Sequence, residues 1–256
     1  MKAGEEGAAS FHVLSFESID GTNAEARRQL NTGAGAGTVI WARRQEAGRG
    51  RRGRAWVSED GNLFCSVIVR PDCALGEAAQ LSLVTALAVA ETVDTALGGA
   101  VPVRVKWPND VLAGGRKLAG ILLESDSGAG DGAAFLVVGV GINIAHAPEA
   151  TEFPATSLAR EGAAGLSVVA VLEGFLDRFA VWYRRWSREG LAPVRAAWLA
   201  RAAGLDGPVT VRLHAETLSG SFIGLDEGGA LLLTPDGGGP VRRIAAGDVF
   251  FPVTPC

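Results

Sequence analysis

The sequence predicts an α+β protein with a mixed or antiparallel sheet and a small C-terminal β-barrel. Three β-type segments, at residues 103–107, 117–124 and 135–144, follow one another too closely for a crossover helix between each pair, so the sheet is not doubly wound. After residue 204 the sequence pattern changes to five short β-type segments within about fifty residues, which is typical of a small barrel. We therefore expect two domains, residues 1–204 and 205–256.

Each element has its own local signal. β-branched, aromatic or alternating apolar residues predict strands early in the chain at residues 12–16, 38–42 and 62–70. Residues 22–25 fit a capping box that opens a helix to about residue 30. Apolar residues at helical spacing predict further helices at residues 77–97, 168–188 and 193–203.

The two later helices carry aromatic side chains on their apolar faces, which we expect to belong to the core: Phe175, Phe179, Trp182, Trp186 and Trp198. The five C-terminal strands are expected at residues 209–213, 218–225, 230–234, 241–244 and 249–253.

Composition excludes several classes of protein. The formal net charge of -4 argues against a surface made for nucleic acid, which needs a broadly basic face. The N-terminus has no signal-peptide pattern, and no stretch reaches the roughly 18 consecutive apolar residues of a membrane span. We expect a cytoplasmic protein that binds neither DNA nor membranes.

Lysine is rare in this sequence. Lys and Arg together number 24, yet the only lysines are Lys2, Lys106 and Lys117. Because arginine serves wherever either cation will do, the two internal lysines are expected where a compact ammonium is needed. Both lie at ends of neighbouring predicted strands, so they could converge on one site.

A glycine-arginine stretch at residues 48–54 needs an explanation. Arg49, Arg51, Arg52 and Arg54 repel one another unless solvent or an anion compensates them. One reading is a solvated loop; the other is an anion clamp, in which glycines free backbone N–H groups and guanidinium groups bind carboxylate or phosphate oxygens. An RNA-binding segment is disfavoured, since only Trp56 follows for base stacking. The stretch lacks P-loop spacing, and residues 139–144 lack the third glycine of a dinucleotide site.

Two further segments combine charge with strand ends. Residues 106–110, with the sequence KWPND, place an ammonium, an amide and a carboxylate at a strand terminus, which suits a nucleotide phosphate and magnesium. Residues 116–124 begin an apolar strand with Lys117. Taken singly, each segment fits an ordinary turn or a solvated strand end.

Together the motifs resemble those of a known family. The segments GRGRRGR at 48–54, KWPND at 106–110, KLAGIL at 117–122 and GVGIN at 139–143 are similar to the successive signatures of bacterial biotin protein ligases. The resemblance extends from about residue 16 to residue 251. Since only about fifteen residues precede the first strand, we expect the monofunctional form without the N-terminal DNA-binding domain of about sixty residues.

The resemblance implies a fold and a reaction. The catalytic domain should be similar to class II aminoacyl-tRNA synthetases and lipoate ligases, and the C-terminal barrel should be SH3-like. Biotin and ATP would form biotinyl-5'-AMP and pyrophosphate, and a lysine of biotin carboxyl carrier protein would then take the biotin and release AMP. ATP and Mg²⁺ are the implied co-substrate and ion, biotin is the substrate, and no prosthetic group is expected. A homodimer is compatible with the resemblance.

The resemblance also assigns residues. The implied catalytic residues are Arg49, Arg51, Lys106, Asp110 and Lys117, with Asp110 also as a magnesium ligand. The implied biotin-binding residues are Gly21, Thr22, Asn23, Gln45, Arg49, Gly50, Arg51, Lys117 and Gly120. The implied ATP-binding residues are Arg51, Arg54, Trp56, Lys106, Asn109, Lys117 and Asn143. Gly21 stands where many relatives have serine, so one hydroxyl contact to biotin is lost or replaced by backbone.

Alternatives stay open at this point. A lipoate or octanoate ligase shares the fold and the adenylate chemistry, but its substrates lack the ureido group of biotin. A biotin-binding module without catalysis would have no use for a phosphate site at residues 106–110.

Overall fold

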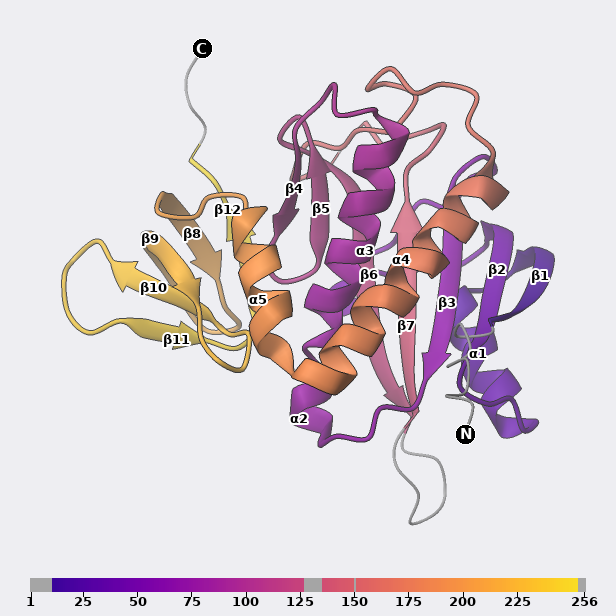
Figure 1. The fold of residues 1–256 in the computed structure, drawn as a ribbon. Helices are drawn as coiled ribbons and strands as arrows, with labels where there is room; N and C mark the ends of the chain where they lie inside the picture. Colours follow the sequence, from indigo (N-terminus) through magenta and orange to yellow (C-terminus); the bar gives the residue numbers. More distant parts are fainter. Residues whose placement is uncertain (1–10, 127–134, 150, 253–256) are drawn as a thin grey trace, which may run out of the picture.

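The structure, a computed structural model, describes residues 11–126, 135–149 and 151–252. The start of the first predicted domain and the end of the second therefore lie outside the described residues. Within those residues it contains a seven-stranded sheet, a five-stranded sheet and the helices that cover them (Figure 1). The strands of the first sheet are β1 (His12–Ile19), β2 (Thr38–Gln45), β3 (Leu63–Val69), β4 (Val103–Lys106), β5 (Asp110–Ala113), β6 (Arg116–Asp126) and β7 (Phe135–Ile142). The helices are α1 (Thr22–Asn31), α2 (Leu75–Ala78), α3 (Leu81–Ala96), α4 (Val168–Glu189) and α5 (Leu191–Ala200).

The large sheet is mixed, which confirms the predicted fold class. Its strand order is β1-β2-β3-β7-β6-β5-β4, with β1 and β2 parallel and the other neighbours antiparallel. Strand β5 was not predicted. Its signal was a short apolar run followed by Gly114 and Gly115, whose positive φ angles of 55° and 76° suit a tight hairpin turn into β6.

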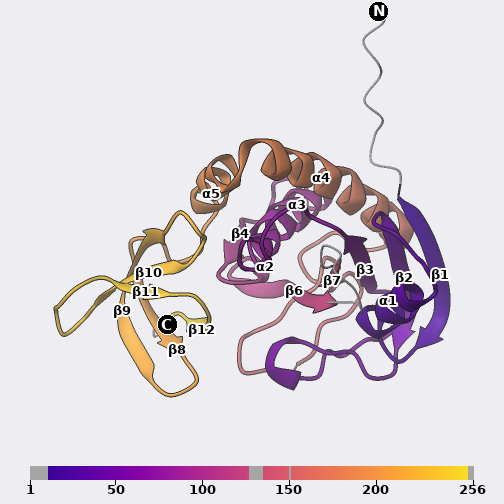
Figure 2. The same cartoon turned by 90° about the horizontal axis from the view of Figure 1, so that it is seen from below.

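Helices cover both faces of this sheet (Figure 2). Helices α3 and α4 pack on one face over alternate strand residues such as Val39, Val67 and Val138. Helix α1 packs on the other face, where Ala26 meets Ile40, Ile68 and Val137 in a smaller cluster. Because side chains alternate across a strand, the same strands supply both layers.

The aromatic residues of α4 and α5 belong to the core, as expected from their spacing. Phe175, Phe179 and Trp198 are at most 1% exposed, and Trp182 and Trp186 are also buried. Trp186 Nε1 donates to Gln80 Oε1 at 2.8 Å. Gln80 lies between α2 and α3, so the single helix predicted over residues 77–97 is two helices that meet there.

The predicted capping box at residues 22–25 is wrong. Gly21 is the N-cap of α1, no side chain caps that helix, and Thr22 is already helical. The Thr22 hydroxyl donates instead to Gln45 Oε1 at 3.1 Å, on strand β2. The sequence pattern assigned the Thr22 hydroxyl to the N-terminus of the helix. In the structure it is bonded to a residue on another element.

The predicted C-terminal strands form the second sheet, at the left of Figure 1. It is antiparallel, with the order β11-β10-β9-β8-β12. Its strands are β8 (Pro208–Arg212), β9 (Thr217–Leu225), β10 (Leu231–Pro235), β11 (Arg242–Ile244) and β12 (Asp248–Phe250). Its buried side chains, including Val209 and Phe222, belong to the same hydrophobic cluster as α3 and β7, so this unit packs firmly on the rest of the molecule.

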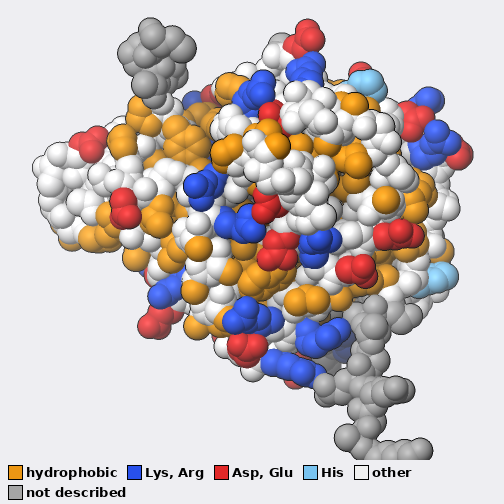
Figure 3. Space-filling view, turned by 45° about the horizontal axis from the view of Figure 1, so that its top comes forward, with side chains coloured by type: hydrophobic (Ala, Val, Ile, Leu, Met, Phe, Trp, Pro, Cys, Tyr) orange, Lys and Arg blue, Asp and Glu red, His pale blue; other side chains and the backbone are white. Residues whose placement is uncertain are grey.

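The surface agrees with the charge of the sequence. On the face shown in Figure 3, basic and acidic side chains alternate and do not gather into one basic area. Among the helices of the described residues, none is long and apolar enough to span a bilayer.

Candidate functional site

One cavity of about 430 Å³ collects the residues that the sequence singled out. Its walls come from the glycine-arginine stretch, the KWPND turn, the start of β6, the N-terminus of α1 and strand β7. The lining includes every predicted site residue: Gly21, Thr22, Asn23, Gln45, Arg49, Gly50, Arg51, Arg54, Trp56, Lys106, Asn109, Asp110, Lys117, Gly120 and Asn143. The expected convergence of three separate stretches of chain on one cationic cavity is therefore confirmed.

The two internal lysines meet at one carboxylate. Lys106 Nζ lies 3.0 Å from Asp110 Oδ2, and Lys117 Nζ lies 2.6 Å from Asp110 Oδ1. The hairpin of β4 and β5 brings Lys106 opposite Asp110, and β6 pairs with β5 to bring up Lys117. The Lys106 and Asp110 side chains are 7% and 10% exposed, whereas that of Lys117 is 26% exposed and reaches into the cavity.

Each of the two ammonium groups also contacts the face of an aromatic ring. Lys106 Nζ lies 4.6 Å from the centroid of the Phe153 ring, and Lys117 Nζ lies 5.4 Å from that of Trp56. A ring face attracts a cation without neutralising it. Each ammonium group thus contacts both the Asp110 carboxylate and an aromatic ring.

Asp110 is held in its ionised form by these neighbours. Burial by itself raises the pKa of this carboxyl, but Lys117 and Lys106 outweigh burial, so the pKa of Asp110 lies below its ordinary value. Both oxygens already face an ammonium group. A magnesium ion bound there would take the place of an ammonium group, so Asp110 as a magnesium ligand stays a prediction. Among the described residues, no three His, Cys, Asp or Glu side chains gather as a metal site.

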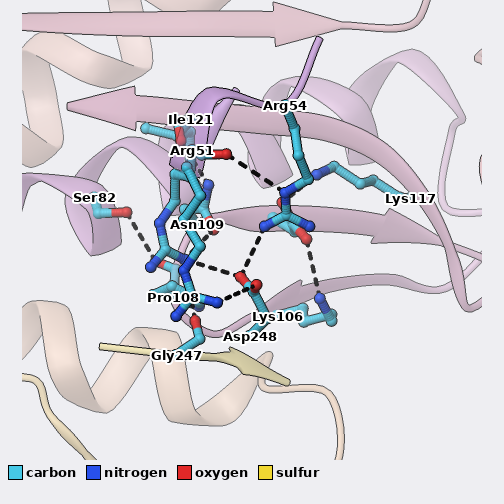
Figure 4. Close-up of polar contacts among 12 residues, drawn as sticks. Arg51, Arg54, Ser82, Lys106, Pro108, Asn109, Lys117, Ile121, Gly247 and Asp248 are labelled. Atoms are coloured by element: carbon cyan, nitrogen blue, oxygen red, sulfur yellow. Dashed lines mark hydrogen bonds and ion pairs between the residues drawn. The ribbon is translucent and has the colours of Figure 1, made fainter. Parts of the chain in front are cut away.

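Two asparagines brace the same region through their side-chain amides. Asn109 Nδ2 donates to the Ile121 carbonyl at 2.7 Å, and Asn109 Oδ1 accepts from Arg51 Nη1 at 3.2 Å (Figure 4). Asn143 Nδ2 donates to the Thr156 carbonyl at 3.0 Å. Their amides tie the cavity wall together, and Asn109 aims the Arg51 guanidinium.

The glycine-arginine stretch folds as a short 3-10 helix, Arg51–Gly53, at the rim of the cavity. Three of its arginines converge on Asp248, which begins β12 in the C-terminal sheet (Figure 4). Arg52 and Arg54 stay exposed, as in a solvated loop, but they also pair with Asp248, so solvent is not their only partner. Asp248 itself lines the cavity, and no sequence signal pointed to it.

The opposite end of the cavity, beside Thr22 and Gln45, is polar. Gln45 Oε1 accepts from the Thr22 amide N–H at 2.9 Å and from its hydroxyl at 3.1 Å. Gln45 Nε2 donates to Ser58 Oγ at 2.9 Å. These bonds orient the Gln45 amide, which keeps one further N–H beyond its bond to Ser58.

Asn23 lines the cavity but makes its polar contacts with protein. Asn23 Nδ2 donates to Glu124 Oε2 at 2.7 Å, and Asn23 Oδ1 accepts from Ser66 Oγ at 2.6 Å. Gly139 makes room for this side chain, because a Cβ at Gly139 would collide with Asn23 Oδ1. Ser66 is fully buried on β3 and its hydroxyl also approaches Thr22 Oγ1, so it aligns two predicted ligand-binding residues. Sequence reasoning missed Ser66 inside an apolar strand.

Trp56 lies across two glycines on neighbouring strands. A Cβ at Gly141 would lie 2.6 Å from Trp56 Cε2, and one at Gly120 would lie 2.9 Å from Cζ3. The bare backbone of β6 and β7 thus lets the indole ring enter the cavity between the lysine end and the amide end. Gly120 of the KLAGIL segment and Gly141 of the GVGIN segment are explained by this close approach, whereas Gly139 makes room for Asn23.

The arrangement suits a ligand with an anionic part and a neutral polar part. Lys106, Lys117 and Arg51 offer charge at one end, and Gln45 and Thr22 offer hydrogen bonds at the other. A few aligned polar groups in a largely preformed cavity are typical of a small-molecule site.

Comparisons with known proteins agree with this geometry. Residues 15–143 match the model of the biotin/lipoate A/B protein ligase family, and residues 204–251 match that of the biotin protein ligase C-terminal domain. The chain is 45% identical over 241 residues to the biotin--[acetyl-CoA-carboxylase] ligase of Paracoccus denitrificans, covering 91% of this chain and 97% of that protein. It is 32% identical to the bifunctional ligase/repressor BirA of Bacillus subtilis, covering 93% of this chain and 73% of that protein.

Solved structures have the same fold. The biotin protein ligase from Aquifex aeolicus in complex with biotin and ATP superposes with a TM-score of 0.79 at 27% identity, covering 93% of this chain and 97% of that one. The biotin protein ligase from Leishmania major in complex with biotinyl-5-AMP superposes with a TM-score of 0.64 at 25% identity, covering 91% and 98%.

Proposed function

The chain belongs to the biotin/lipoate A/B protein ligase family and is a biotin protein ligase, and from this premise we propose how its cavity performs ATP-dependent biotinylation. The observation that carries the proposal is the meeting of Lys106, Lys117 and Arg51 with the Gln45 amide around one cavity. The reaction has two steps, formation of biotinyl-5'-AMP and transfer of biotin to a carrier lysine.

In the first step the biotin carboxylate attacks the α-phosphate of ATP. A bond forms between a carboxylate oxygen and the α-phosphorus, the bond from that phosphorus to the oxygen bridging to the β-phosphate breaks, and pyrophosphate leaves. Lys117 contacts the carboxylate and the α-phosphate oxygens, and Lys106 contacts the rest of the triphosphate. Arg49, Arg51 and Arg54 surround the same phosphates from the loop. Asn109 and Asn143 position the nucleotide, and Trp56 packs near the adenine.

Charge is the physical obstacle in this step, because an anionic nucleophile approaches a polyanion. Two unit charges at about 4 Å interact by ~1 kcal/mol in water but by ~4 kcal/mol at an effective dielectric near 20. Buried ammonium groups such as Lys106 therefore lower the barrier far more than solvated ones would. Asp110 keeps the two lysines in place and remains charged itself. No covalent enzyme intermediate is needed, since positioning and electrostatic stabilisation suffice.

The polar end of the cavity accepts the ureido group of biotin. Thr22 and Gln45 supply hydrogen bonds there, and Gly21, Gly50 and Gly120 allow the ligand to approach the backbone. Hydrogen bonds of Ser66 to Thr22 and Asn23 keep this part of the wall in position. A site built for a ureido group rejects lipoate or octanoate, which lack it, by a factor of up to about 10⁴.

In the second step the amine of a carrier lysine attacks the carbonyl carbon of the mixed anhydride. An amide bond forms and AMP leaves with the electrons of the broken carbon-oxygen bond. We propose biotin carboxyl carrier protein, or the corresponding domain of a biotin-dependent carboxylase, as the carrier. The test is transfer of biotin to that purified domain, detected by the mass increase of its lysine.

The experiment that tests the first step is exchange of labelled pyrophosphate into ATP. Exchange that requires biotin and is not supported by lipoate or octanoate is the expected result. Exchange with lipoate at the same rate would favour the alternative ligase, and no exchange with any of the three acids would remove the proposal.

Replacing Gly139 with alanine is expected to raise KM for biotin about tenfold, because the new Cβ displaces Asn23 and, through Ser66, Thr22. Exchange assays at varied biotin concentration measure this. Gly35→Ala is the matched control, since a Cβ at Gly35 meets nothing within 4 Å. An unchanged KM in Gly139→Ala would show that the alignment of Asn23 has no part in biotin binding.

Further expectations belong to the proposal. A cytoplasmic location suits a ligase that consumes ATP, and gel filtration decides between a monomer and the homodimer with which the family resemblance is compatible. The division into a catalytic domain, residues 1–204, and an SH3-like domain, residues 205–256, stays a prediction; so does the absence of DNA binding.

A further inference from the structure

One carboxylate from the C-terminal sheet lies close to three arginines of the glycine-arginine loop. Arg52 Nη1 donates to Asp248 Oδ2 at 3.0 Å, and Arg54 Nη2 donates to Asp248 Oδ1 at 2.9 Å. Arg51 Nη1 lies 3.7 Å from Asp248 Oδ1 and donates to the neighbouring Gly247 carbonyl at 3.2 Å. The anion that the crowded arginines require is thus supplied by the protein itself, from nearly 200 residues further along the chain (Figure 4).

The backbone of the loop also shows that it is held. Arg52 has φ 55° and ψ 29°, in the left-handed region that residues other than glycine rarely adopt. Such a conformation persists where surrounding contacts impose it. The contact that Arg52 makes is with Asp248, on a different sheet.

Asp248 is well placed to act as a fixed anchor. Its side chain is 13% exposed, and β12 pairs with β8 through Asp248, Val249 and Phe250. Gly247 packs closely on β8, where a Cβ would lie 2.9 Å from Val211 Cγ1. Because the C-terminal sheet shares the main hydrophobic cluster, the anchor is rigidly joined to the sheet that carries the lysines.

The contact continues into the cavity. Arg51 Nη1, beside Asp248 and Gly247, also donates to Asn109 Oδ1. Asn109 in turn donates to a carbonyl of β6, the strand that carries Lys117. The Arg51 side chain is 22% exposed, whereas those of Arg52 and Arg54 are 40% and 54% exposed. Arg51 lines the cavity and is the least exposed of the three arginines, while Arg52 and Arg54 donate hydrogen bonds to Asp248.

We propose that Asp248 is a positioning residue for the adenylation step: it holds residues 51–54 over the cavity so that Arg51 meets the triphosphate. The C-terminal sheet thereby becomes part of the ATP site without supplying a group that reacts. This inference rests on the proposed ligase function and adds a residue to it.

The test compares Asp248→Asn with the wild-type chain. The variant keeps the size of the side chain and removes its charge, so the arginines lose their common partner. We expect KM for ATP to rise about tenfold, as for loss of a charged hydrogen-bond partner, and kcat to change less than about threefold. KM for biotin should rise less than KM for ATP, although Gly50 and Arg51 of the same loop are also assigned to biotin. Trypsin, which cuts after arginine, should cleave within residues 49–54 several times faster than in the wild type.

Two further variants make the result specific. Asp236→Asn removes the same charge from an exposed turn that follows β10 of the same sheet and should leave both readouts unchanged. Asp248→Glu restores the carboxylate and should recover most of the affinity for ATP. Thermal unfolding of all variants checks that the C-terminal sheet remains folded.

Two outcomes overturn the inference. Unchanged KM for ATP and unchanged cleavage would show that Asp248 does not position the loop. A lower KM for ATP would show that Asp248 competes with the triphosphate for the arginines. Cleavage is measured without substrates, so it tests whether Asp248 holds the loop independently of catalysis. Absence of pyrophosphate exchange in the wild-type chain would remove the proposed function and would leave the cleavage result valid.

Discussion

Replacing Lys117 with alanine is expected to slow biotin-dependent pyrophosphate exchange by a factor of about 100 to 1,000, the usual cost of removing one group that stabilises transition-state charge. Lys117 Nζ lies in the cavity between Asp110 and the Trp56 ring, so its charge is fixed in advance of the reaction. The loss should fall mainly on kcat, because the negative charge around the α-phosphate is redistributed in the transition state.

Arg116 provides the matched control for this substitution. It is the preceding residue on β6, but it pairs with Glu161 at 2.7 Å and does not line the cavity. Arg116→Ala should keep exchange within about twofold of the wild type, as for a partly exposed ion pair. Wild-type exchange in Lys117→Ala would remove Lys117 from the mechanism.

Replacing Asp110 with asparagine is expected to destabilise the fold by about 3–5 kcal/mol and to impair exchange as well. The substitution leaves the Lys106 ammonium 7% exposed without its partner and releases Lys117 from its tether. Urea denaturation measures the free energy of unfolding. The control is Asp94→Asn, since Asp94 makes a half-exposed ion pair with Arg201 at 3.2 Å and should cost at most about 1 kcal/mol.

The same carboxylate predicts how stability depends on pH. The pKa of Asp110 is lower in the folded chain than in the unfolded chain, where it is about 3.9. Its contribution is therefore complete above the unfolded pKa and is lost as the pH falls below that value through the lowered folded pKa. Asp110→Asn should abolish this part of the acid dependence. Equal losses of stability on acidification in both proteins would contradict it.

The candidate site was largely predictable because its chemistry is local in the sequence. The glycine-arginine run, the KWPND turn and the lysine that opens β6 each place a charged group next to a strand end or glycine, and all three line one cavity. The scarcity of lysine singled out Lys106 and Lys117 before any contact was known. The mixed sheet and the C-terminal strands followed from segment lengths and turn residues in the same way.

The errors occurred where a distant partner replaced a local one. Thr22 bonds Gln45 and does not cap α1. Ser66 is hidden in an apolar strand, although its hydroxyl aligns Asn23 and Thr22.

The sequence alone determined the class of fold, the family resemblance and fifteen of the residues that line the cavity, since residue type and short spacing encode turns, strands and reactive groups. Only the tertiary structure decided which groups neutralise one another. Asp248 and Arg54 are 194 positions apart, and Asn23 and Glu124 are 101 apart. Contacts of that kind depend on how the sheets pack, because an ion pair or hydrogen bond acts over a few ångströms of space and leaves no periodicity along the chain.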